Sequence, residues 1–468
     1  MPDTSLPTQP DNRTALERSA LFVATLTSFM GPFMISAVNV ALPAIQADLG
    51  MNAVSLSWIA TSYLLAVAVV LLPAGKIADI HGRKKVFTAG LVTYTLASTA
   101  AAFAGNAAWL LIFRAMQGLG AGMFITTGMA ILTSIFPPQK RGRAIGIYVA
   151  AVYVGLSVGP FAGGILTQQW GWRAIFLIML PLGAVSIAIT CLFLKGEWAD
   201  SRSQRLDLPG SVLYAAAILC LIYGATVLPS ATGCVLLGFG VAGLLLFFRQ
   251  QRRATQPLFE VALFVENRTF TFSSLAALLN YSATFAVTFL LSLYLQYLKG
   301  MPPRAAGLLL MVQPVGMAIV SPIAGRLSDR IEPRLLASAG MAITVAGMLA
   351  FTQLRADSGS TGIAWTLALL GFGFALFSSP NMSAIMGSVA KEQYGIASGA
   401  VATMRLMGQM LSMAIATVVL ALLLGQETIG PGNYDRFLLS IRVVFTLSAL
   451  LCGVGVYFSL FRGRLRQP

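Results

Sequence analysis

Residues 56–74 read LSWIATSYLLAVAVVLLPA, and residues 75–85, which follow directly, read GKIADIHGRKK. The first stretch has 19 residues and no charge, which is close to the length of about 20 apolar residues that a helix needs to cross a bilayer. The second stretch carries four cations and one carboxylate. This order predicts a membrane-crossing helix that ends in a basic loop.

The whole chain repeats this pattern. Its 468 residues are 57% apolar and 10% charged, whereas a soluble protein averages about 45–50% apolar and about 25% charged residues. This composition predicts an all-α polytopic membrane protein and excludes soluble enzymes, secreted domains and nucleic-acid modules. Apolar runs bounded by charges or by proline and glycine clusters give fourteen predicted spans: 20–43, 56–74, 87–104, 108–136, 144–168, 173–194, 209–229, 232–248, 270–298, 305–324, 335–354, 361–389, 395–425 and 438–461.

The cations are distributed unevenly between the two sides of the membrane. Because fourteen is an even number, both termini are predicted to lie on one side. That side carries 23 of the 31 Lys and Arg residues, and the other side carries five: Arg173, Lys299, Arg304, Arg355 and Arg436. The positive-inside rule therefore predicts a multi-pass protein of the cytoplasmic membrane with both termini in the cytoplasm. The net charge of +15 indicates topology and contact with anionic lipid rather than nucleic-acid binding.

The loop at residues 75–85 has a second copy 250 residues later, GRLSDRIEPRL at 325–335. Both copies are predicted to be cytoplasmic, so the repeats are parallel, and duplicated halves are typical of secondary transporters. Six spans fall in each copy and two lie between them, which is a 6+2+6 plan. The predicted division is a cytoplasmic tail at 1–19, a six-helix bundle at 20–195, a linker with two inserted helices at 196–268, a second six-helix bundle at 269–461 and a cytoplasmic tail at 462–468.

Other motifs bear on energy source and chemistry. The polar first 19 residues show no cleavable signal peptide, so the first span is predicted to act as the insertion signal. The four cysteines fall within apolar runs and are predicted to be packing residues. No GKS or GKT string occurs, which argues against ATP as energy source, and no paired carboxylates, HExxH motif or Ser/His pair falls within a span. We therefore expect no enzyme, no metal and no cofactor.

The repeated loop predicts a gate on the cytoplasmic side. Its residues are Gly75, Asp79, Gly82, Arg83 and Lys84 in the first copy, and Gly325, Asp329 and Arg330 in the second. A carboxylate among cations at the end of a helix bundle can hold a charge pair that closes this side and breaks when the halves rock apart. The alternative is ordinary positive-inside decoration. The Gly-x3-Asp spacing is preserved in both copies, which favours the gate.

Span 108–136 carries an arginine within the membrane, Arg114, three residues before Gln117. Residues at i and i+3 share a helix face, and an intramembrane cation is costly and usually faces a polar cavity. We therefore predict that this pair lines a cavity, with snorkelling to the outer interface as the alternative.

Span 144–168 contains GLSVGPFAGGIL. Its glycines let helix backbones approach closely, and its proline removes one hydrogen bond and allows a bend. The spacing predicts a packing helix through Gly155, Gly159, Pro160, Gly163 and Gly164.

These strings together resemble the motifs of the major facilitator superfamily. GKIADIHGRKK resembles its loop signature, RAMQGLGAG its span-4 motif and GLSVGPFAGG its antiporter motif, while VNVALP at 38–43 and GWRAIF at 171–176 are similar to the fourteen-span drug:proton antiporter branch. The resemblance covers essentially the whole chain. It implies two six-helix bundles around a central cavity that opens alternately to each side, with proton entry driving export of drugs, as in antibiotic resistance. It further implies that Asp79 and Arg83 serve the gate, Arg114 proton coupling and the antiporter motif helix packing.

One position departs from that branch. Its members commonly carry an aspartate five residues before the Asn of VNVALP, where this chain has Met34, and none of the sixteen carboxylates falls within a predicted span. Arg114 and Arg405 leave the interior with cations only, which favours an anionic or neutral substrate over a lipophilic cation. Other polar residues within spans are candidates for the substrate cavity, with interhelical hydrogen bonds as the alternative: Ser36, Asn39, Tyr63, Asn280, Tyr281, Gln313, Asn381 and Gln409.

The prediction is a secondary active exporter of small amphipathic compounds that works by proton antiport and alternating access. Its partners are a small-molecule substrate, protons and membrane lipids, and a monomer is favoured. Three alternatives stay open: an exporter or uniporter of organic anions, weak acids or lipid-like molecules, a non-transporting membrane protein that keeps the fold, and an intramembrane enzyme. The lack of catalytic constellations within the spans disfavours the last.

Overall fold

The computed structural model of the chain describes residues 10–199, 206–228, 230–254, 258, 261–389, 394–425 and 427–463. Helices fill nearly all of this part, which contains no strand. They are α1 (Pro10–Leu49), α2 (Ala53–His81), α3 (Arg83–Ala102), α4 (Ala107–Ile135), α5 (Pro138–Trp170), α6 (Arg173–Leu177), α7 (Met179–Phe193), α8 (Leu208–Thr226), α9 (Ala231–Gln251), α10 (Val261–Glu266), α11 (Arg268–Thr284), α12 (Ala286–Tyr297), α13 (Pro303–Leu310), α14 (Val312–Ser328), α15 (Pro333–Phe351), α16 (Ser360–Gly387), α17 (Tyr394–Leu424) and α18 (Tyr434–Phe461). The predicted all-α class is confirmed.

Each of the fourteen predicted spans is occupied by one helix or by two consecutive helices. Thirteen helical segments of the described chain are long and apolar enough to cross a membrane. The fourteenth span corresponds to α3, a helix of 20 residues that is less apolar because it carries several Thr and Ser side chains. The polytopic character predicted from composition is therefore confirmed.

Three predicted spans are divided in two by a local break. Pro181 and Pro314 each lie three residues after a break, between α6 and α7 and between α13 and α14. A proline has no N–H to donate to the carbonyl four residues before it, which accounts for these two breaks. The break between α11 and α12 has no proline. There the backbone N–H of Ala286 donates to Ser412 Oγ of α17 at 3.0 Å.

The parallel repeat predicted from the loops recurs in the helix crossings. A Cβ atom at Gly90 of α3 would lie 2.7 Å from the carbonyl oxygen of Gly120 in α4, and one at Gly340 of α15 would lie 2.6 Å from that of Gly373 in α16. Gly90 and Gly340 are 250 residues apart. We call α1–α7 the N-terminal half and α11–α18 the C-terminal half.

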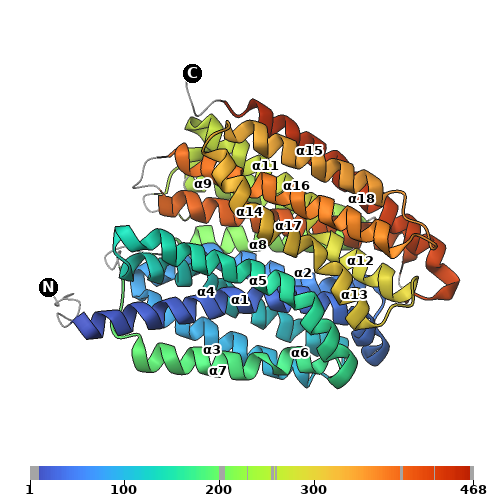
Figure 1. Ribbon diagram of the computed structural model, residues 1–468, viewed down its shortest axis with the longest axis horizontal. Coiled ribbons are helices and arrows are strands. Elements are labelled where there is room, and N and C mark those ends of the chain that lie inside the picture. The colour runs from blue at the N-terminus through green and yellow to red at the C-terminus, as the bar shows by residue number, and fades with distance from the viewer. Residues whose placement is uncertain are drawn as a thin grey trace.

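The first residues of α1 and the last residues of α18 lie toward the same end of the helix bundle (Figure 1). We call this the terminal end and the opposite one the distal end. At the terminal end α1 begins at Pro10, ten residues before the predicted span, and Glu17 of α1 pairs with Lys140 of α5 at 3.2 Å. The helix therefore extends into residues 10–19 of the predicted tail, whose cytoplasmic placement stays a prediction, and residues 1–9 lie outside the described chain.

The two inserted helices form a hairpin on the outside of the molecule. Gly240 and Gly243 of α9 pack closely on Leu221 and Ala217 of α8. At the terminal end, Asp207 accepts hydrogen bonds from the side chains of Gln250 and Gln251. These contacts make α8 and α9 one unit, and α8 in turn contacts α2 and α17, one helix from each half.

Candidate functional site

The Arg114 side chain is buried and hydrogen-bonded within the N-terminal half. Its side chain is 1% exposed, its Nε donates to the carbonyl oxygen of Ile59 at 3.0 Å, and its Nη1 donates to Gln117 Oε1. Gln117 in turn donates to Ser98 Oγ at 2.6 Å, and the guanidinium lies 4.6 Å from the centre of the Tyr63 ring. Arg114 and Gln117 share a helix face and hydrogen-bond to each other, and both are fully buried within the bundle. This burial does not fit the snorkelling alternative, and neither side chain borders an open cavity in the described part of the structure, so the cavity role stays a prediction.

Arg405 occupies a different kind of place, on α17 near the boundary between the halves. The residue is half-buried, and its Nε is buried without a hydrogen-bond partner. Tyr281 of α11 in the same half lies within hydrogen-bonding reach of Arg405, and Tyr148 of α5 in the other half lies near its charge. Of the two intramembrane arginines predicted as site residues, Arg405 is the one that keeps unused hydrogen-bonding capacity.

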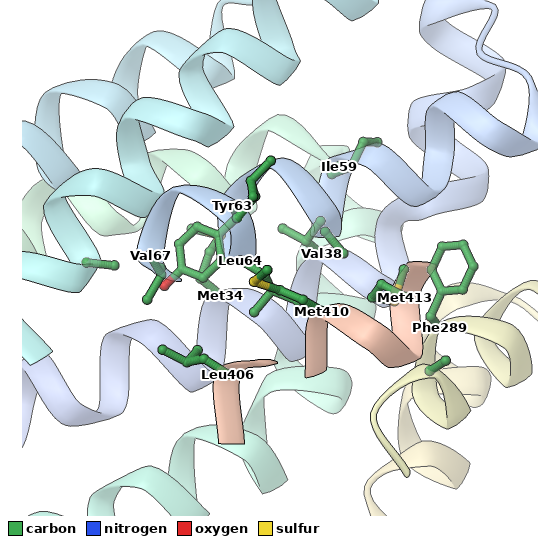
Figure 2. Packing of buried hydrophobic residues seen from close by; sticks show 14 of the residues in the cluster. Met34, Val38, Ile59, Tyr63, Leu64, Val67, Phe289, Leu406, Met410 and Met413 are labelled. Atoms are coloured by element: carbon green, nitrogen blue, oxygen red, sulfur yellow. The ribbon is translucent and has the colours of Figure 1, made fainter. Parts of the chain in front are cut away.

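Met34 lies in an apolar cluster between the halves. Its side chain is fully buried, together with Tyr63 and Leu64 of α2 and Met410 of α17 (Figure 2). The position at which the resemblance expects an aspartate is therefore buried among hydrophobic side chains in this chain.

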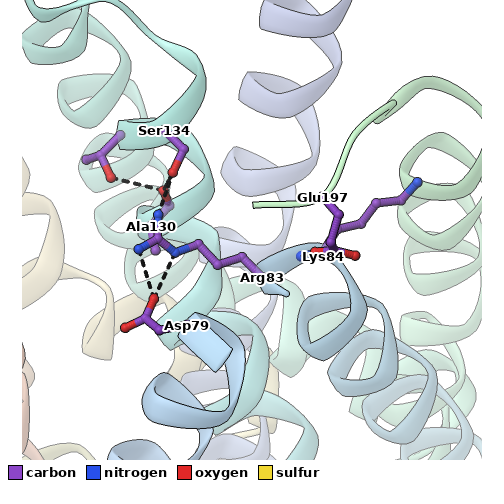
Figure 3. Close-up of polar contacts among 7 residues, drawn as sticks. Asp79, Arg83, Lys84, Ala130, Ser134 and Glu197 are labelled. Carbon is purple, nitrogen blue, oxygen red and sulfur yellow. Dashed lines mark hydrogen bonds and ion pairs between the residues drawn. The ribbon is translucent and has the colours of Figure 1, made fainter. Parts of the chain in front are cut away.

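The predicted gate loop holds a hydrogen-bonded group within the N-terminal half. Arg83 donates to Asp79 Oδ1 through Nε at 3.0 Å and Nη2 at 2.8 Å, and to Ser134 Oγ of α4 at 2.6 Å (Figure 3). The backbone N–H of Lys84 donates to Glu197 Oε1 at 2.8 Å. Gly82 has φ of 116°, and a Cβ there would overlap the Glu197 carboxylate.

The second copy of the loop repeats part of this arrangement. Gly75 of α2 faces Thr126 of α4 and Gly325 of α14 faces Ser379 of α16, with a Cβ 3.1 and 3.0 Å from the nearest side-chain atom. The position 250 residues after Arg83 is Pro333. Asp329 therefore has no arginine four residues later, and Arg330 lies exposed in the following turn.

The antiporter motif holds α5 against both halves. A Cβ at Gly155, Gly159 or Gly163 would lie 2.6–2.7 Å from atoms of α1, and one at Gly164 would lie 2.5 Å from the carbonyl oxygen of Pro303 in the C-terminal half. A Cβ at Gly307 of α13 would overlap the carbonyl oxygen of Pro160. The predicted packing role of these residues fits this geometry.

The two halves are joined by hydrogen bonds near the distal end. Five hydrogen bonds between described residues join one half to the other in this region: Ser292 Oγ to Asn39 O at 2.6 Å, Gln296 Nε2 to Val40 O at 2.9 Å, Tyr297 Oη to Gln46 Oε1, Thr417 Oγ1 to Ser57 Oγ at 2.7 Å, and Ala53 N to Glu427 O at 3.3 Å. We call these five the distal links. They hold the two halves together at the distal end of the interface.

The remaining cavity candidates are mostly used in packing. Ser36 bonds the carbonyl of Pro32 in its own helix. The backbone of Gln313 lies against Gly371, and the amide of Asn280 contacts Cys452 Sγ at 3.9 Å. Asn381 donates to the carbonyl of Ser273 at 3.1 Å. Tyr281 stacks edge-on against Phe374, and Gln409 is half-buried.

Sequence reasoning missed two charged residues with structural contacts. Glu197 falls in the predicted linker, yet it lies against the turn at Gly82. Arg462 falls in the predicted C-terminal tail, yet it is 1% exposed and donates to Asn381 Oδ1 at 2.6 Å, so this residue packs into the C-terminal half. Burial lowers the pKa of Arg462 to about 10. No pattern in the sequence separates Arg462 from the arginines that follow it.

Fourteen spans, six in each of two parallel copies and two between the copies, define a polytopic membrane transporter rather than an enzyme. A family model described as Major Facilitator Superfamily matches residues 22–413 and 273–468. The chain belongs to the major facilitator superfamily.

Several relatives are named for resistance or transport. The multidrug resistance protein Stp of Mycobacterium tuberculosis is 33% identical over 87% of this chain and 77% of its own. The riboflavin transporter RibZ of Clostridioides difficile is 29% identical over 94% of this chain and 96% of its own, and the tetracenomycin C resistance and export protein of Streptomyces glaucescens is 32% identical over 82% and 72%. The crystal structure of a bacterial homologue of the lysosomal transporter Spinster shares the fold, with a TM-score of 0.70, 16% identity and 97% of both chains covered.

Proposed function

We propose that this transporter exports small amphipathic compounds from the cytoplasm or the inner leaflet, in exchange for protons, by alternating access. The observation that supports the proposal is the set of distal links, which joins the halves at the distal end of the interface by five hydrogen bonds. When the distal links break, the transporter opens at the distal end. When the gate loops approach each other, it closes at the terminal end. Both termini are taken to face the cytoplasm of a bacterial inner membrane, as the distribution of Lys and Arg predicts.

Proton coupling is assigned to the group around Arg114. A guanidinium stays protonated, so Arg114 is not itself the proton carrier; it can change the affinity of neighbouring groups for protons or substrate through its charge. Its hydrogen bonds to Ile59 of α2 and Gln117 of α4 tie that charge to two helices of one half. When α2 and α4 move relative to each other, the electrostatic field of Arg114 changes at the interface between the two halves.

The test is proton movement in liposomes that contain the purified protein and a trapped pH dye. Lipophilic cations and organic anions are added in turn under an imposed proton gradient. Proton release coupled to a compound supports antiport, whereas flux that does not respond to the gradient contradicts it.

A second candidate function is the export of organic anions or weak acids, and it is favoured by Arg405. This cation keeps a buried Nε without a partner, and no carboxylate forms an ion pair with it among the described residues. An anionic substrate would supply the missing counter-charge. A response to anions alone, lost in Arg405→Ala and retained in Arg442→Ala, would assign the protein to this class.

A further inference from the structure

The two seams between the halves differ in burial. One seam is formed by α2 and α17, the other by α5 with α13 and α14. In the most apolar stretch of each, 61% of the residues of α2 and 56% of those of α17 are buried, compared with 33% in α5 and 28% in α13–α14. Ser57 in the first seam and Gly307 in the second are 250 residues apart. The two seams are thus equivalent positions of the repeat. The repeat alone would give them the same burial, so it does not account for the difference in the buried fraction of their helices.

Among the described helices, the inserted hairpin covers one of the two seams. α8 packs against both α2 and α17 and lies at the level where the halves meet (Figure 1). α9 packs on the far side of α8, with Phe239 and Leu245 67% and 66% exposed. Among the described helices, none takes the equivalent place over the other seam, where Val154 of α5 and Ile319 of α14 are 50% and 63% exposed.

The hairpin is attached to the two halves in different ways. On α2, the hydroxyl of the buried Tyr214 donates to the carbonyl oxygen of Ala68 at 3.2 Å, and Tyr223 lies with its ring centre 6.1 Å from that of Trp58. On α17, the described residues of α8 make neither a hydrogen bond nor a ring contact, so that contact is nonpolar packing. Nonpolar packing has no fixed direction and tolerates sliding better than a directed hydrogen bond does.

We propose that the α8–α9 hairpin moves with the N-terminal half and keeps the α2/α17 seam covered while α17 slides along α8. Compounds dissolved in the bilayer then reach the interior through the seam of α5 with α13 and α14. This inference rests on the rocking of the halves in the proposed function. It does not depend on which compound is carried or on proton coupling.

The test measures distances between spin labels at exposed positions of the terminal end, after the four native cysteines have been replaced by alanine. Leu208→Cys on the hairpin is paired with His81→Cys of the N-terminal half or with Ile331→Cys of the C-terminal half, and the His81/Ile331 pair reports the rocking. The distal links are weakened by Tyr297→Phe to populate the second state. We expect a second distance for Leu208/Ile331 and for His81/Ile331, and one unchanged distance for Leu208/His81. A second distance for Leu208/His81 would overturn the proposal.

The anchor on α2 is tested separately. Tyr214→Phe removes the hydrogen bond to Ala68 and keeps the ring, and Tyr214→Ala removes both. Both variants are expected to broaden the Leu208/His81 distance distribution, Tyr214→Ala more strongly. The matched control is Ser211→Ala, whose hydroxyl bonds only Asp207 O within the same hairpin. An equally narrow distribution in all three variants would show that Tyr214 does not hold the hairpin. Because these readouts need no substrate, their failure is distinguishable from failure of the transport assay.

Discussion

The Thr417 hydroxyl of α17 lies 2.7 Å from Ser57 Oγ of α2, across the boundary between the halves, and shares its hydrogen with the Met413 carbonyl oxygen of its own helix, also at 2.7 Å. Both side chains are fully buried. In the other seam, the position equivalent to Ser57 is Gly307, which lies against the carbonyl of Pro160. One seam is thus closed by a hydrogen bond and the other by direct backbone contact.

Thr417→Val removes this hydrogen bond and keeps the shape of the side chain. A buried hydrogen bond contributes about 1 kcal/mol net, so the population with a separated distal end should rise about fivefold. Spin labels at the exposed distal positions Phe103→Cys and Trp365→Cys measure that population. Thr403→Val is the control, because the Thr403 hydroxyl bonds Gly399 O within α17 itself. Equal populations in both variants would show that the Thr417 hydroxyl is not a link between the halves.

Gly307→Ala places a methyl group where the carbonyl of Pro160 lies. Overpacking of this kind costs about 1–3 kcal/mol, and we expect a lower unfolding temperature together with a distal end that no longer closes. Thermal unfolding of the purified protein and the Phe103/Trp365 label pair measure the two effects. Gly146→Ala on α5 is the control, since a Cβ there meets nothing within 4 Å. If Gly307→Ala has the same unfolding temperature as Gly146→Ala, α5 and α13 move apart enough to accommodate the methyl group with little loss of stability.

Arg114→Lys keeps the charge and loses the fork of donors that reaches Ile59 and Gln117. We expect substrate-driven proton movement to fall at least tenfold in the liposome assay, with the protein still folded. The effect of Gln117→Ala should be non-additive with it, because both changes disrupt one hydrogen-bonded group. Arg442→Lys serves as control, since Arg442 donates to Leu354 O away from this group. If substrate-driven proton movement in Arg114→Lys equals that of the unchanged protein, proton coupling depends on residues other than Arg114.

Met34→Asp puts a carboxyl group into the apolar cluster between the halves. Burial without a partner costs about 3 kcal/mol, so the unfolding temperature should fall. If the interior lacks only a proton-binding carboxylate for lipophilic cations, the variant should also gain cation-dependent proton release. Met34→Leu controls for packing and Met34→Asn for polarity. A variant that is as stable as Met34→Leu would show that the cluster is not dry.

Periodicity predicted more of the fold than of the site. Spans, repeat and the Arg114–Gln117 pair follow from local rules, because length, apolarity and i,i+3 spacing are properties of single helices. The bond of Arg114 to Ile59 O and the placement of Glu197 at Gly82 depend on how separate segments meet, which single-helix patterns do not encode. The distal links belong to the same group, since Gln296 and Tyr297 resemble ordinary polar residues at a helix end.

The outer position of the α8–α9 hairpin bears on the evolution of the chain. α9 rests on α8 and α8 rests on helices that already contact each other, so a hairpin could be added between two duplicated copies without changing any contact inside either one. Its even number of crossings also leaves the orientation of the second copy as it was. A twelve-helix ancestor could therefore acquire the insertion in a single step.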